Sequence, residues 1–408
     1  MFLLAIVLLT APAAAPSAFA ADATWTGTLS SSWSNLLNWT SLISPPGSGD
    51  IATFSNAGNG NTTLNLGTGV TVRTILFDTS NAAAYTIGSG GVGSQTLTLN
   101  NSGAITVNGT VTNNETFNAN IVLGTNANAS AYTFTNNSTT GGQVLTIAGN
   151  VSSGTGGTVG NKTLTLTGAG NGLISGIISG NGTGGTGTVA LTKSGAGTWR
   201  LSGANTYTGT TTVIGGTLLI NGNQSAATGA VTVSNSGTTL GGTGTIGGTV
   251  TVNAGANIAP GNGGNTTAIL NTGALTLAST SNFRVDINGT IAGSGYDRLN
   301  VTTGIVSIGG SNVVVTVGTT LAIGQTFLIV NKVSAGAVSG TFAQGSTVTS
   351  GPFSFAIDYA GGDGNDIVLT VTAVPEPSTW IGGAFALAAL GYMQRRKLKK
   401  FTRERFRS

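Results

Sequence analysis

Apolar residues alternate with threonine, serine and asparagine in short runs along most of this chain. The alternation is clearest between residues 191 and 262, where Gly-rich segments separate one run from the next. A period of two bounded by Gly and Asn is typical of half-buried strands, and no window there keeps the spacing of an amphipathic helix. The pattern predicts an all-β solenoid with these apolar positions turned inward: Trp199, Leu201, Val213, Leu218, Ile220, Val231, Val233, Val250 and Val252.

Similar runs continue on both sides of this stretch. Their unequal spacing predicts coils of unequal length, and the Gly and Asn residues between them suit corners with positive φ. The runs Val313–Val317 and Phe327–Val330 are almost continuously apolar, which predicts strands buried on both faces. We therefore expect a right-handed parallel β-helix over residues 61–373, its hand following that of parallel crossovers. The runs before the central stretch lie at 63–66, 70–72, 74–77, 96–99, 105–107, 144–147 and 163–166.

The composition removes several kinds of chemistry. Among 408 residues there are 67 Gly, no His and no Cys, and only 6% are charged. Without His and Cys there can be no Ser-His-Asp or Cys-His nucleophile and no zinc–thiolate site. Charged residues make up about a quarter of an ordinary globular protein. A rod of stacked coils with Thr and Asn facing water explains the low charge, and we expect no cofactor.

The net charge of +4 is unevenly distributed. Residues 21–374 carry seven basic and nine acidic side chains, a net charge of −2, and the basic excess lies in the tail after Pro375. The body of the chain therefore lacks the basic footprint of a nucleic-acid-binding protein.

Residues 1–20 form an apolar segment that ends in Ala18-Phe19-Ala20. A small-x-small pattern after an apolar run is typical of a secretory signal peptide. We expect cleavage between Ala20 and Ala21, after export through the Sec translocon.

Three tryptophans, Trp25, Trp33 and Trp39, follow within fifteen residues. Exposed indole rings could stack on sugars and form a carbohydrate site. Alternatively they could cover the first coil, whose apolar interior and unpaired strand edge would otherwise face water. We favour this second interpretation and assign residues 21–60 to a Trp-rich N-terminal cap.

Carboxylates are the remaining candidates for catalysis, since a glycosidase needs two of them about 5–9 Å apart. Asp286 with Asp297 is one possible pair, and Asp358, Asp363 and Asp366 form a possible cluster. Against catalysis, Asp297 beside Arg298 is typical of a corner ion pair, and single Asp residues commonly close turns through their own backbone. No acid, base and oxyanion set converges, so we expect no enzymatic activity.

The segment Gly361–Leu369 fits the calcium-binding nonapeptide GGxGxDxUx, with Asp363 and Asp366 as weak ligand candidates. That site needs successive repeats stacked on one another. One copy supplies fewer oxygens than the six to eight that Ca²⁺ takes. We expect no metal here, and a turn into a last strand over Ile367–Val371.

Within the central stretch, Thr192–Thr198 (TKSGAGT), Leu201–Gly209 (LSGANTYTG) and Gly215–Leu218 (GGTL) resemble the autotransporter-associated β-strand repeat. The likeness extends loosely through Leu240–Ile246 and Ile258–Asn262, so its core covers residues 191–262. The resemblance implies an extended, exported surface protein of the parallel β-helix passenger type. It implies no particular reaction.

The tail, residues 374–408, contains Val374-Pro375-Glu376-Pro377, an apolar run from Trp380 to Met393, and a basic cluster that begins at Arg395, Arg396 and Lys397. It resembles the PEP-CTERM sorting signal. The resemblance implies recognition by an exosortase, cleavage near Pro375–Pro377, and display or release at the surface of a Gram-negative cell.

Physical chemistry supports part of that implication. An apolar segment followed by a positive cluster is typical of a stop-transfer sequence with its basic end in the cytoplasm. The segment Trp380–Met393 has fourteen residues, whereas a comfortable membrane span takes about 20. We therefore favour a transient inner-membrane intermediate over the alternative, a permanent membrane anchor.

Taken with the catalytically poor composition, the two resemblances favour a structural or adhesive protein of the cell surface or extracellular matrix. Its Thr-, Ser- and Asn-rich face could hydrogen-bond exopolysaccharide or neighbouring proteins. The alternative is a carbohydrate-active β-helix enzyme, a glycoside hydrolase or lyase acting on exopolysaccharide. A third possibility, an autotransporter passenger, would call for a C-terminal β-barrel of about 250 residues.

Overall fold

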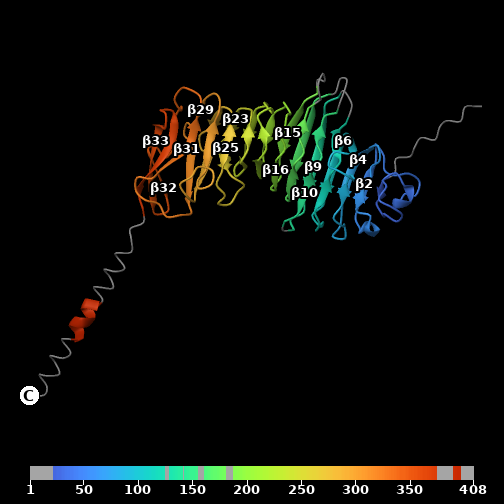
Figure 1. Cartoon of the computed structure of the whole chain (residues 1–408), viewed down its shortest axis with the longest axis horizontal. Helices are drawn as coiled ribbons and strands as arrows, with labels where there is room; N and C mark the ends of the chain where they lie inside the picture. Colours follow the sequence, from blue (N-terminus) through green and yellow to red (C-terminus); the bar gives the residue numbers. More distant parts are fainter. Residues whose placement is uncertain are drawn as a thin grey trace, which may run out of the picture.

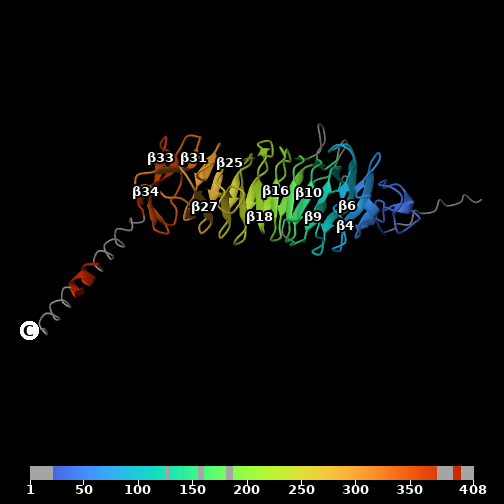
Figure 2. The same cartoon turned by 60° about the horizontal axis from the view of Figure 1, so that its bottom comes forward.

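The chain folds into a rod of stacked β-coils (Figure 1). The computed structural model describes residues 22–124, 128–140, 142–154, 160–180, 187–374 and 389–396. Each coil contributes short strands to sheets that run along the rod, and the coils follow one another in sequence order (Figure 2). The all-β, parallel β-helix architecture predicted from the alternation is therefore confirmed.

The first sheet has fifteen strands, and all of its paired strands run parallel. Twelve of them form its main path and three short strands pair beside it. The main path is β1 (Ala23–Thr24), β2 (Ile51–Phe54), β4 (Val70–Phe77), β6 (Thr96–Val107), β9 (Ser130–Asn136), β12 (Lys162–Thr167), β15 (Val189–Lys193), β17 (Thr211–Val213), β20 (Val231–Val233), β23 (Val250–Val252), β26 (Leu275–Leu277) and β29 (Val306–Ser307). The short strands are β8 (Asn120–Leu123), β11 (Val151–Ser152) and β14 (Ile178–Ser179).

The second sheet has eleven strands, which are also parallel. They are β3 (Thr63–Leu64), β5 (Thr86–Ile87), β7 (Glu115–Phe117), β10 (Val144–Ile147), β13 (Asn171–Ile174), β16 (Thr198–Leu201), β18 (Thr217–Ile220), β21 (Thr239–Gly242), β24 (Asn257–Pro260), β27 (Asn282–Ile287) and β30 (Asn312–Val317).

The third sheet occupies the C-terminal half of the rod and has eight strands. Its first five are parallel: β19 (Asn223–Gln224), β22 (Thr245–Ile246), β25 (Ile269–Thr272), β28 (Arg298–Val301) and β31 (Thr326–Lys332). Its last three are antiparallel: β34 (Asp366–Ala373), β33 (Phe353–Gly361) and β32 (Thr347–Ser350).

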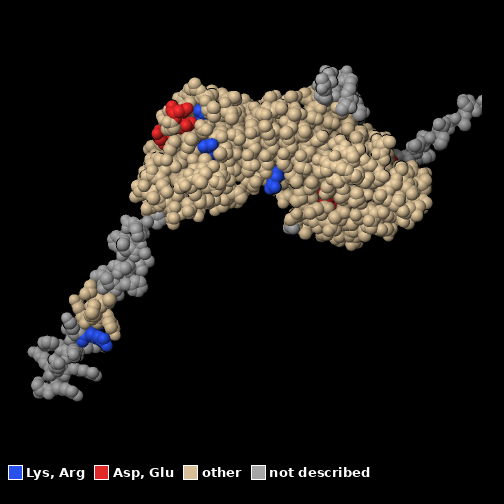
Figure 3. All heavy atoms as spheres, viewed as in Figure 1, with Lys and Arg blue, Asp and Glu red and all other residues tan. Residues whose placement is uncertain are grey.

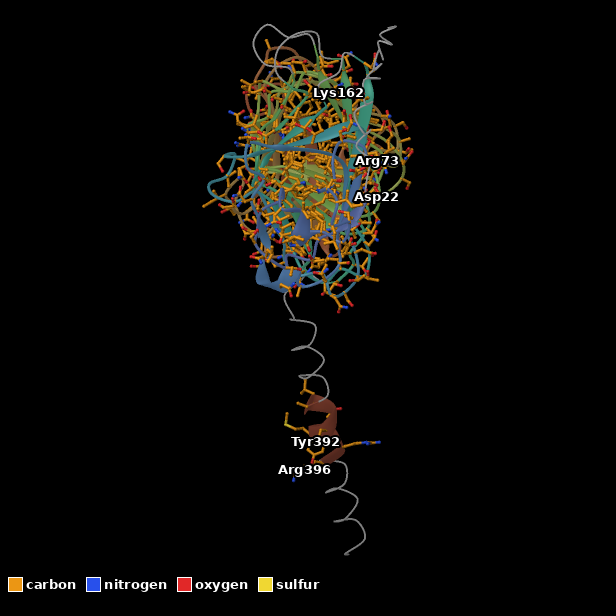
Figure 4. The ribbon with its side chains drawn as sticks, turned by 90° about the vertical axis from the view of Figure 1, so that its right-hand side faces the viewer. Asp22, Arg73, Lys162, Tyr392 and Arg396 are labelled. Atoms are coloured by element: carbon orange, nitrogen blue, oxygen red, sulfur yellow. The ribbon has the colours of Figure 1, made fainter. Side chains whose placement is uncertain are left out.

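Inward side chains lie in columns, each residue over its register partner in the next coil. One column of the second sheet joins Leu145 to Gly172, Trp199, Leu218 and Leu240, and all of them are buried. The view along the rod shows carbon-rich side chains filling the interior, with Asp22 and Arg73 on the outside (Figure 4). The period of two in the sequence is this alternation between lumen and surface.

The coils differ in length, as their spacing in the sequence predicts. Val231 pairs with Val250, nineteen residues later, whereas Ser130 pairs with Lys162, thirty-two residues later. The strands keep their register in both cases, so the extra residues lie in the corners between strands.

Many corner glycines have a role that the sequence did not suggest. Gly176 stacks over Gly149, and a Cβ built on it would lie 2.0 Å from the carbonyl oxygen of Gly149. Gly203 and Gly222 repeat the contact in the following coils, each with a Cβ position 2.2 Å from the glycine oxygen beneath. These three are not among the glycines with positive φ. They are required by the close approach of successive corners, and not by the backbone angle that we expected.

The N-terminal segment buries its tryptophans. Trp25 and Trp39 are 0% exposed and Trp33 is 3% exposed, and their rings pack edge to face with centroids 4.7–5.0 Å apart. Every indole N–H donates to a backbone carbonyl: Trp25 to Asn61, Trp33 to Pro46 and Trp39 to Trp33. Rings enclosed in this way cannot stack on a sugar. Two short 3-10 helices, η1 (Leu36–Asn38) and η2 (Gly58–Gly60), complete this end.

The C-terminal end differs from the prediction in two ways. Parallel coiling stops at β31, and the chain then folds back as the antiparallel strands β32–β34 over the last coil. In addition, Val314 and Val317 of β30 are only half-buried, so this strand has one buried face instead of two. The expected turn within Gly361–Leu369 is confirmed, since Gly361 pairs with Asp366 across the β33–β34 hairpin.

A short helix occupies residues 389–396, and all eight of its residues are exposed. Within it the Arg396 guanidinium lies 5.8 Å from the centre of the Tyr392 ring, both labelled in Figure 4. Among the described residues no helix is long and apolar enough to span a membrane. Several predicted processing residues lie outside the described ranges: Ala18, Ala20, Ala21, Pro375, Glu376, Pro377, Trp380 and Lys397.

Candidate functional site

Two rows of side chains run along the outer face of the second sheet, roughly parallel to the axis of the rod. In the first row Leu173 pairs in register with Arg200, which pairs with Leu219. The second row is polar and joins Thr198, Thr217, Thr239, Asn257, Asn282 and Asn312. Neighbouring rungs lie about 4.8 Å apart, so hydroxyl and amide groups follow one another at a regular spacing along this face. Asn257 is 3% exposed and the other five are half-buried.

The asparagines of the polar row bond to one another. The amide of Asn257 donates to the Thr239 hydroxyl at 3.2 Å, that of Asn282 to Asn257 at 3.0 Å, and that of Asn312 to Asn282 at 3.1 Å. Each amide is therefore held by the coil before it. From Thr239 to Asn312, side-chain hydrogen bonds therefore link the row from coil to coil.

The segment 261–268, between β24 and β25, divides this face into two hollows. It is fixed by paired backbone bonds between Gly242 and Gly261 and by the Asn221 amide, which donates to the Asn262 side-chain oxygen at 2.8 Å. Leu219 lines both hollows and is 2% exposed, although it points away from the core. The face of the rod seen in Figure 3 has few charged side chains, and a basic side chain lies beside a hollow in its lower edge.

The first hollow has a volume of about 330 Å³ and a mixed lining. Val144, Leu173 and Leu219 supply aliphatic surface, while Asn171 and Thr198 supply polar groups. Its one charged lining residue is Arg200 of β16, which is exposed and whose guanidinium makes no hydrogen bond within the described part of the chain. This hollow, which we call the Arg200 groove, is defined by Val144, Asn171, Gly172, Leu173, Thr198, Arg200, Leu219 and Asn262.

The second hollow, of about 300 Å³, contains Arg284, Asp286 and Thr316. Burial raises the pKa of the Asp286 carboxyl, and the Thr316 hydroxyl and the Arg284 charge oppose that rise. Arg284 also donates to the Asn257 side-chain oxygen at 3.2 Å. The charges of this hollow therefore interact with each other, in contrast to the unpaired cation of the Arg200 groove.

Asp297, the proposed partner of Asp286, is sealed inside a corner. It is 1% exposed, and its two oxygens accept the backbone N–H groups of Ala268 at 2.8 Å and Asp286 at 3.0 Å. Burial raises its pKa to about 7, and the Asp286 charge adds to the rise. Among the described residues no ion pair joins it to Arg298: the groups that act on the Asp297 carboxyl are the two backbone N–H groups and the Asp286 charge. The expected corner ion pair is thus wrong, and the Asp297 oxygens are not free to meet a substrate.

The three C-terminal acids are not brought together as a site. Asp358 is exposed and accepts the Ala360 backbone N–H, and Asp366 is 4% exposed and accepts that of Lys332. Asp363 is exposed at the β33–β34 turn. Among the described residues no group of three or more acidic side chains could hold a metal ion.

Three lysines of the body are buried, and two of them, Lys193 and Lys332, each bind three backbone carbonyl oxygens at a corner of the rod. The sequence analysis did not single them out. Lys193 Nζ donates to the carbonyl oxygens of Ser194, Gly195 and Gly215 at 2.7–2.9 Å, and it is 0% exposed. Burial lowers its pKa to about 8. Lys332 is 2% exposed and likewise donates to three carbonyl oxygens at 2.6–2.7 Å. An inward, alternating position occupied by lysine is the sequence signal that would have identified both.

Glu115 is a further buried charge that the sequence did not reveal. It occupies an inward position of β7 in register with Leu145, and it is 1% exposed. One carboxyl oxygen accepts the Tyr85 backbone N–H at 2.9 Å, and the other has no hydrogen-bond partner. Burial raises the pKa of Glu115 to about 9, so the side chain is neutral inside the folded rod at pH 7.

The fold and its grooved outer face define a class of protein: a parallel β-helix with a row of polar side chains along the outer face of one sheet. Residues 191–220 match the family model of the passenger-associated-transport-repeat. That stretch comprises most of β15, all of β16, β17 and β18, and both Lys193 and Arg200. The match supports the autotransporter-associated repeat and points to an exported, cell-surface protein. A search of curated proteins finds no match to the chain.

Proposed function

We propose that this protein is a structural or adhesive component of the cell surface or extracellular matrix. The observation that carries the proposal is the outer face of the second sheet, where a fixed row of Thr and Asn lies beside an open groove. Amide and hydroxyl groups at a regular spacing along a rigid rod suit a polymer with many hydroxyl groups, such as exopolysaccharide. The repeat match, which points to export, agrees with this role.

We also propose that the tail is a sorting signal that is removed. The support is the Pro375-Glu376-Pro377 motif, the short apolar run from Trp380, and the basic cluster that includes Arg395 and Arg396. On this proposal the chain leaves through the Sec translocon, pauses in the inner membrane of a Gram-negative cell, and is cut by an exosortase-type enzyme.

Intact-mass analysis of protein recovered from the producing cells and their medium tests the sorting proposal. The expected mass corresponds to residues 21 to about 374, with or without an added moiety. A mass that retains Trp380–Ser408 would show that the tail is a permanent anchor and would overturn the proposed processing.

Finally, we propose that the protein has no catalytic activity of its own. The support is the enclosure of Asp297, whose two oxygens are occupied by backbone N–H groups, and the wide use of acids as turn and backbone partners. We expect incubation with acidic and neutral polysaccharides to release reducing ends or unsaturated sugars only at the background rate. Turnover by the wild-type chain that is lost in Asp286→Ala and Asp297→Ala would instead establish the carbohydrate-active enzyme.

A further inference from the structure

We propose that the Arg200 groove binds the carboxylate of an acidic sugar unit in a polysaccharide, with Arg200 as the residue that selects the acidic polymer. The inference rests on the proposed polysaccharide-binding role and adds a position and a ligand class to it. It follows from the state of Arg200, from the lining of the groove, and from the pairing of the strands beneath it.

Arg200 differs from the other exposed arginines of the body. Arg73 donates through Nε to the carbonyl oxygen of Gly49 at 3.0 Å, and Arg284 donates through Nε to Asn257 at 3.2 Å. The Arg200 guanidinium makes no hydrogen bond in the described ranges, yet Arg200 lines a hollow and does not extend from a convex corner. A guanidinium presents five N–H donors in a fork that matches a carboxylate. The geometry therefore leaves one complete anion-binding group directed to a concave surface.

The remainder of the groove suits a sugar ring. Leu173 and Leu219 flank Arg200 in register on the neighbouring strands. Leu219 is 2% exposed, so the aliphatic surface open to a ligand comes mainly from the half-buried Leu173 and Val144. Thr198 of the polar row supplies a hydroxyl group, and Asn171, whose side-chain oxygen accepts the Thr198 backbone N–H at 3.2 Å, supplies the N–H groups of its amide. A pyranose ring has an apolar face and a rim of hydroxyl groups, so it can pack on Leu173 and Val144 while its rim meets Asn171 and Thr198. A carboxylate on that ring would then reach Arg200.

The strand pairing favours a sugar polymer over a peptide. β13, β16 and β18 each pair with a neighbour on both sides, so their backbone N–H and C=O groups are used within the sheet. An extended peptide usually binds a sheet by adding a strand to a free edge. On this face it would find side chains only, and its own backbone groups would lie unpaired over Leu173 and Leu219. A polysaccharide has no such backbone to satisfy.

The test compares binding of the full-length protein to polygalacturonate, its methyl ester and dextran, by affinity electrophoresis at a fixed salt concentration. We expect the wild-type protein to prefer polygalacturonate to the two uncharged polymers. Arg200→Gln should weaken polygalacturonate binding by about tenfold, the worth of a hydrogen bond to a charged group, and should leave dextran binding unchanged. Arg73→Gln, which removes an exposed charge outside the groove, should bind as the wild type does.

The outcomes separate the inference from the proposed function. If Arg200→Gln and wild type bind polygalacturonate equally, the groove assignment is wrong while polysaccharide binding stands. If the wild type binds none of the three polymers, both are wrong. If polyglutamate displaces polygalacturonate at equal charge concentration, the site recognises carboxylates in general and the sugar assignment fails. Equal thermal unfolding of the variants and wild type, expected because Arg200 and Arg73 are exposed, shows that any loss arises from the groove.

Discussion

Replacement of Gly172 by alanine is expected to destabilise the rod by about 3 kcal/mol, the upper range for overpacking a core. Gly172 lies inward on β13, directly beneath Trp199, and a Cβ there would lie 2.3 Å from Cε3 of the indole ring. The indole is 0% exposed and is enclosed by the neighbouring coils, so it cannot swing away. The added methyl group must push two coils apart. Urea unfolding followed by tryptophan fluorescence measures the loss.

The matched control is Gly91→Ala. A Cβ added to Gly91 would have no heavy atom within 4 Å, and the residue has no positive φ, so this substitution should leave stability nearly unchanged. A second control tests the cause directly. In a Trp199→Leu background the smaller side chain should leave room for the added methyl group. The loss of unfolding free energy caused by Gly172→Ala should then be smaller by about 1 kcal/mol or more, a coupling expected of residues in contact. Additive effects would show that the clash with Trp199 is not the reason.

The free energy of unfolding is expected to fall as the pH rises between about 4.5 and about 9, because of Glu115. In the folded rod Glu115 keeps its proton up to a pKa of about 9, whereas in the unfolded chain it loses the proton near pH 4.5. Between these values the folded state binds more protons, so the stability from this group is complete below pH 4.5 and is lost toward pH 9. By pH 7 the loss amounts to about 3 kcal/mol.

Glu115→Gln should remove this fall of the unfolding free energy with rising pH, while its amide oxygen still accepts the Tyr85 backbone N–H. The informative interval is pH 7–8. Asp297, with a pKa raised to about 7, also lowers the free energy of unfolding as the pH rises, but mainly below pH 7. Lys193, with a pKa lowered to about 8, raises the free energy of unfolding as the pH rises above 8. Chemical denaturation of the wild type, Glu115→Gln and the exposed-site control Asp363→Asn gives the comparison. A slope unchanged in Glu115→Gln would contradict the assignment.

The fold could be predicted because one face of nearly every strand is buried. Trp199, Leu201, Leu218 and Ile220 were assigned inward from their alternation, and all four are buried in the structure. A single period of two is enough when each coil repeats the same division between lumen and surface. The roles of the polar side chains were harder to predict, because alternation indicates whether a side chain points inward or outward and says nothing about its hydrogen-bond partners.

Asp297 and Glu115 illustrate that limit. The sequence suggests a catalytic carboxylate or a corner ion pair for Asp297 and assigns no role to Glu115, yet both are enclosed and accept hydrogen bonds from backbone N–H groups. Their partners come from segments eleven to thirty residues away, across corners whose lengths vary from coil to coil. The Arg200 groove was missed for a related reason. One wall of the groove comes from the segment 261–268, which lies against the outer face of the second sheet. The alternation of apolar and polar residues does not predict where such a segment lies.

The antiparallel end was also beyond the reach of pattern analysis. Strands β32–β34 have the same alternation as the parallel strands, since both kinds have a period of two. Direction is set by the connections, and a short hairpin such as Gly361 to Asp366 permits only the antiparallel choice. The antiparallel strands cover the last coil, which would otherwise expose its apolar interior and its strand edges to water.

The constant register of coils that differ by thirteen residues has an evolutionary consequence. The coil from Val231 to Val250 and that from Ser130 to Lys162 stack equally well, so a corner can lengthen or shorten without disturbing the core. The walls of the grooves on the second sheet are such corners. Recognition can therefore diversify by exchange of corner segments on an unchanged framework, in the way that variable loops diversify on a conserved scaffold.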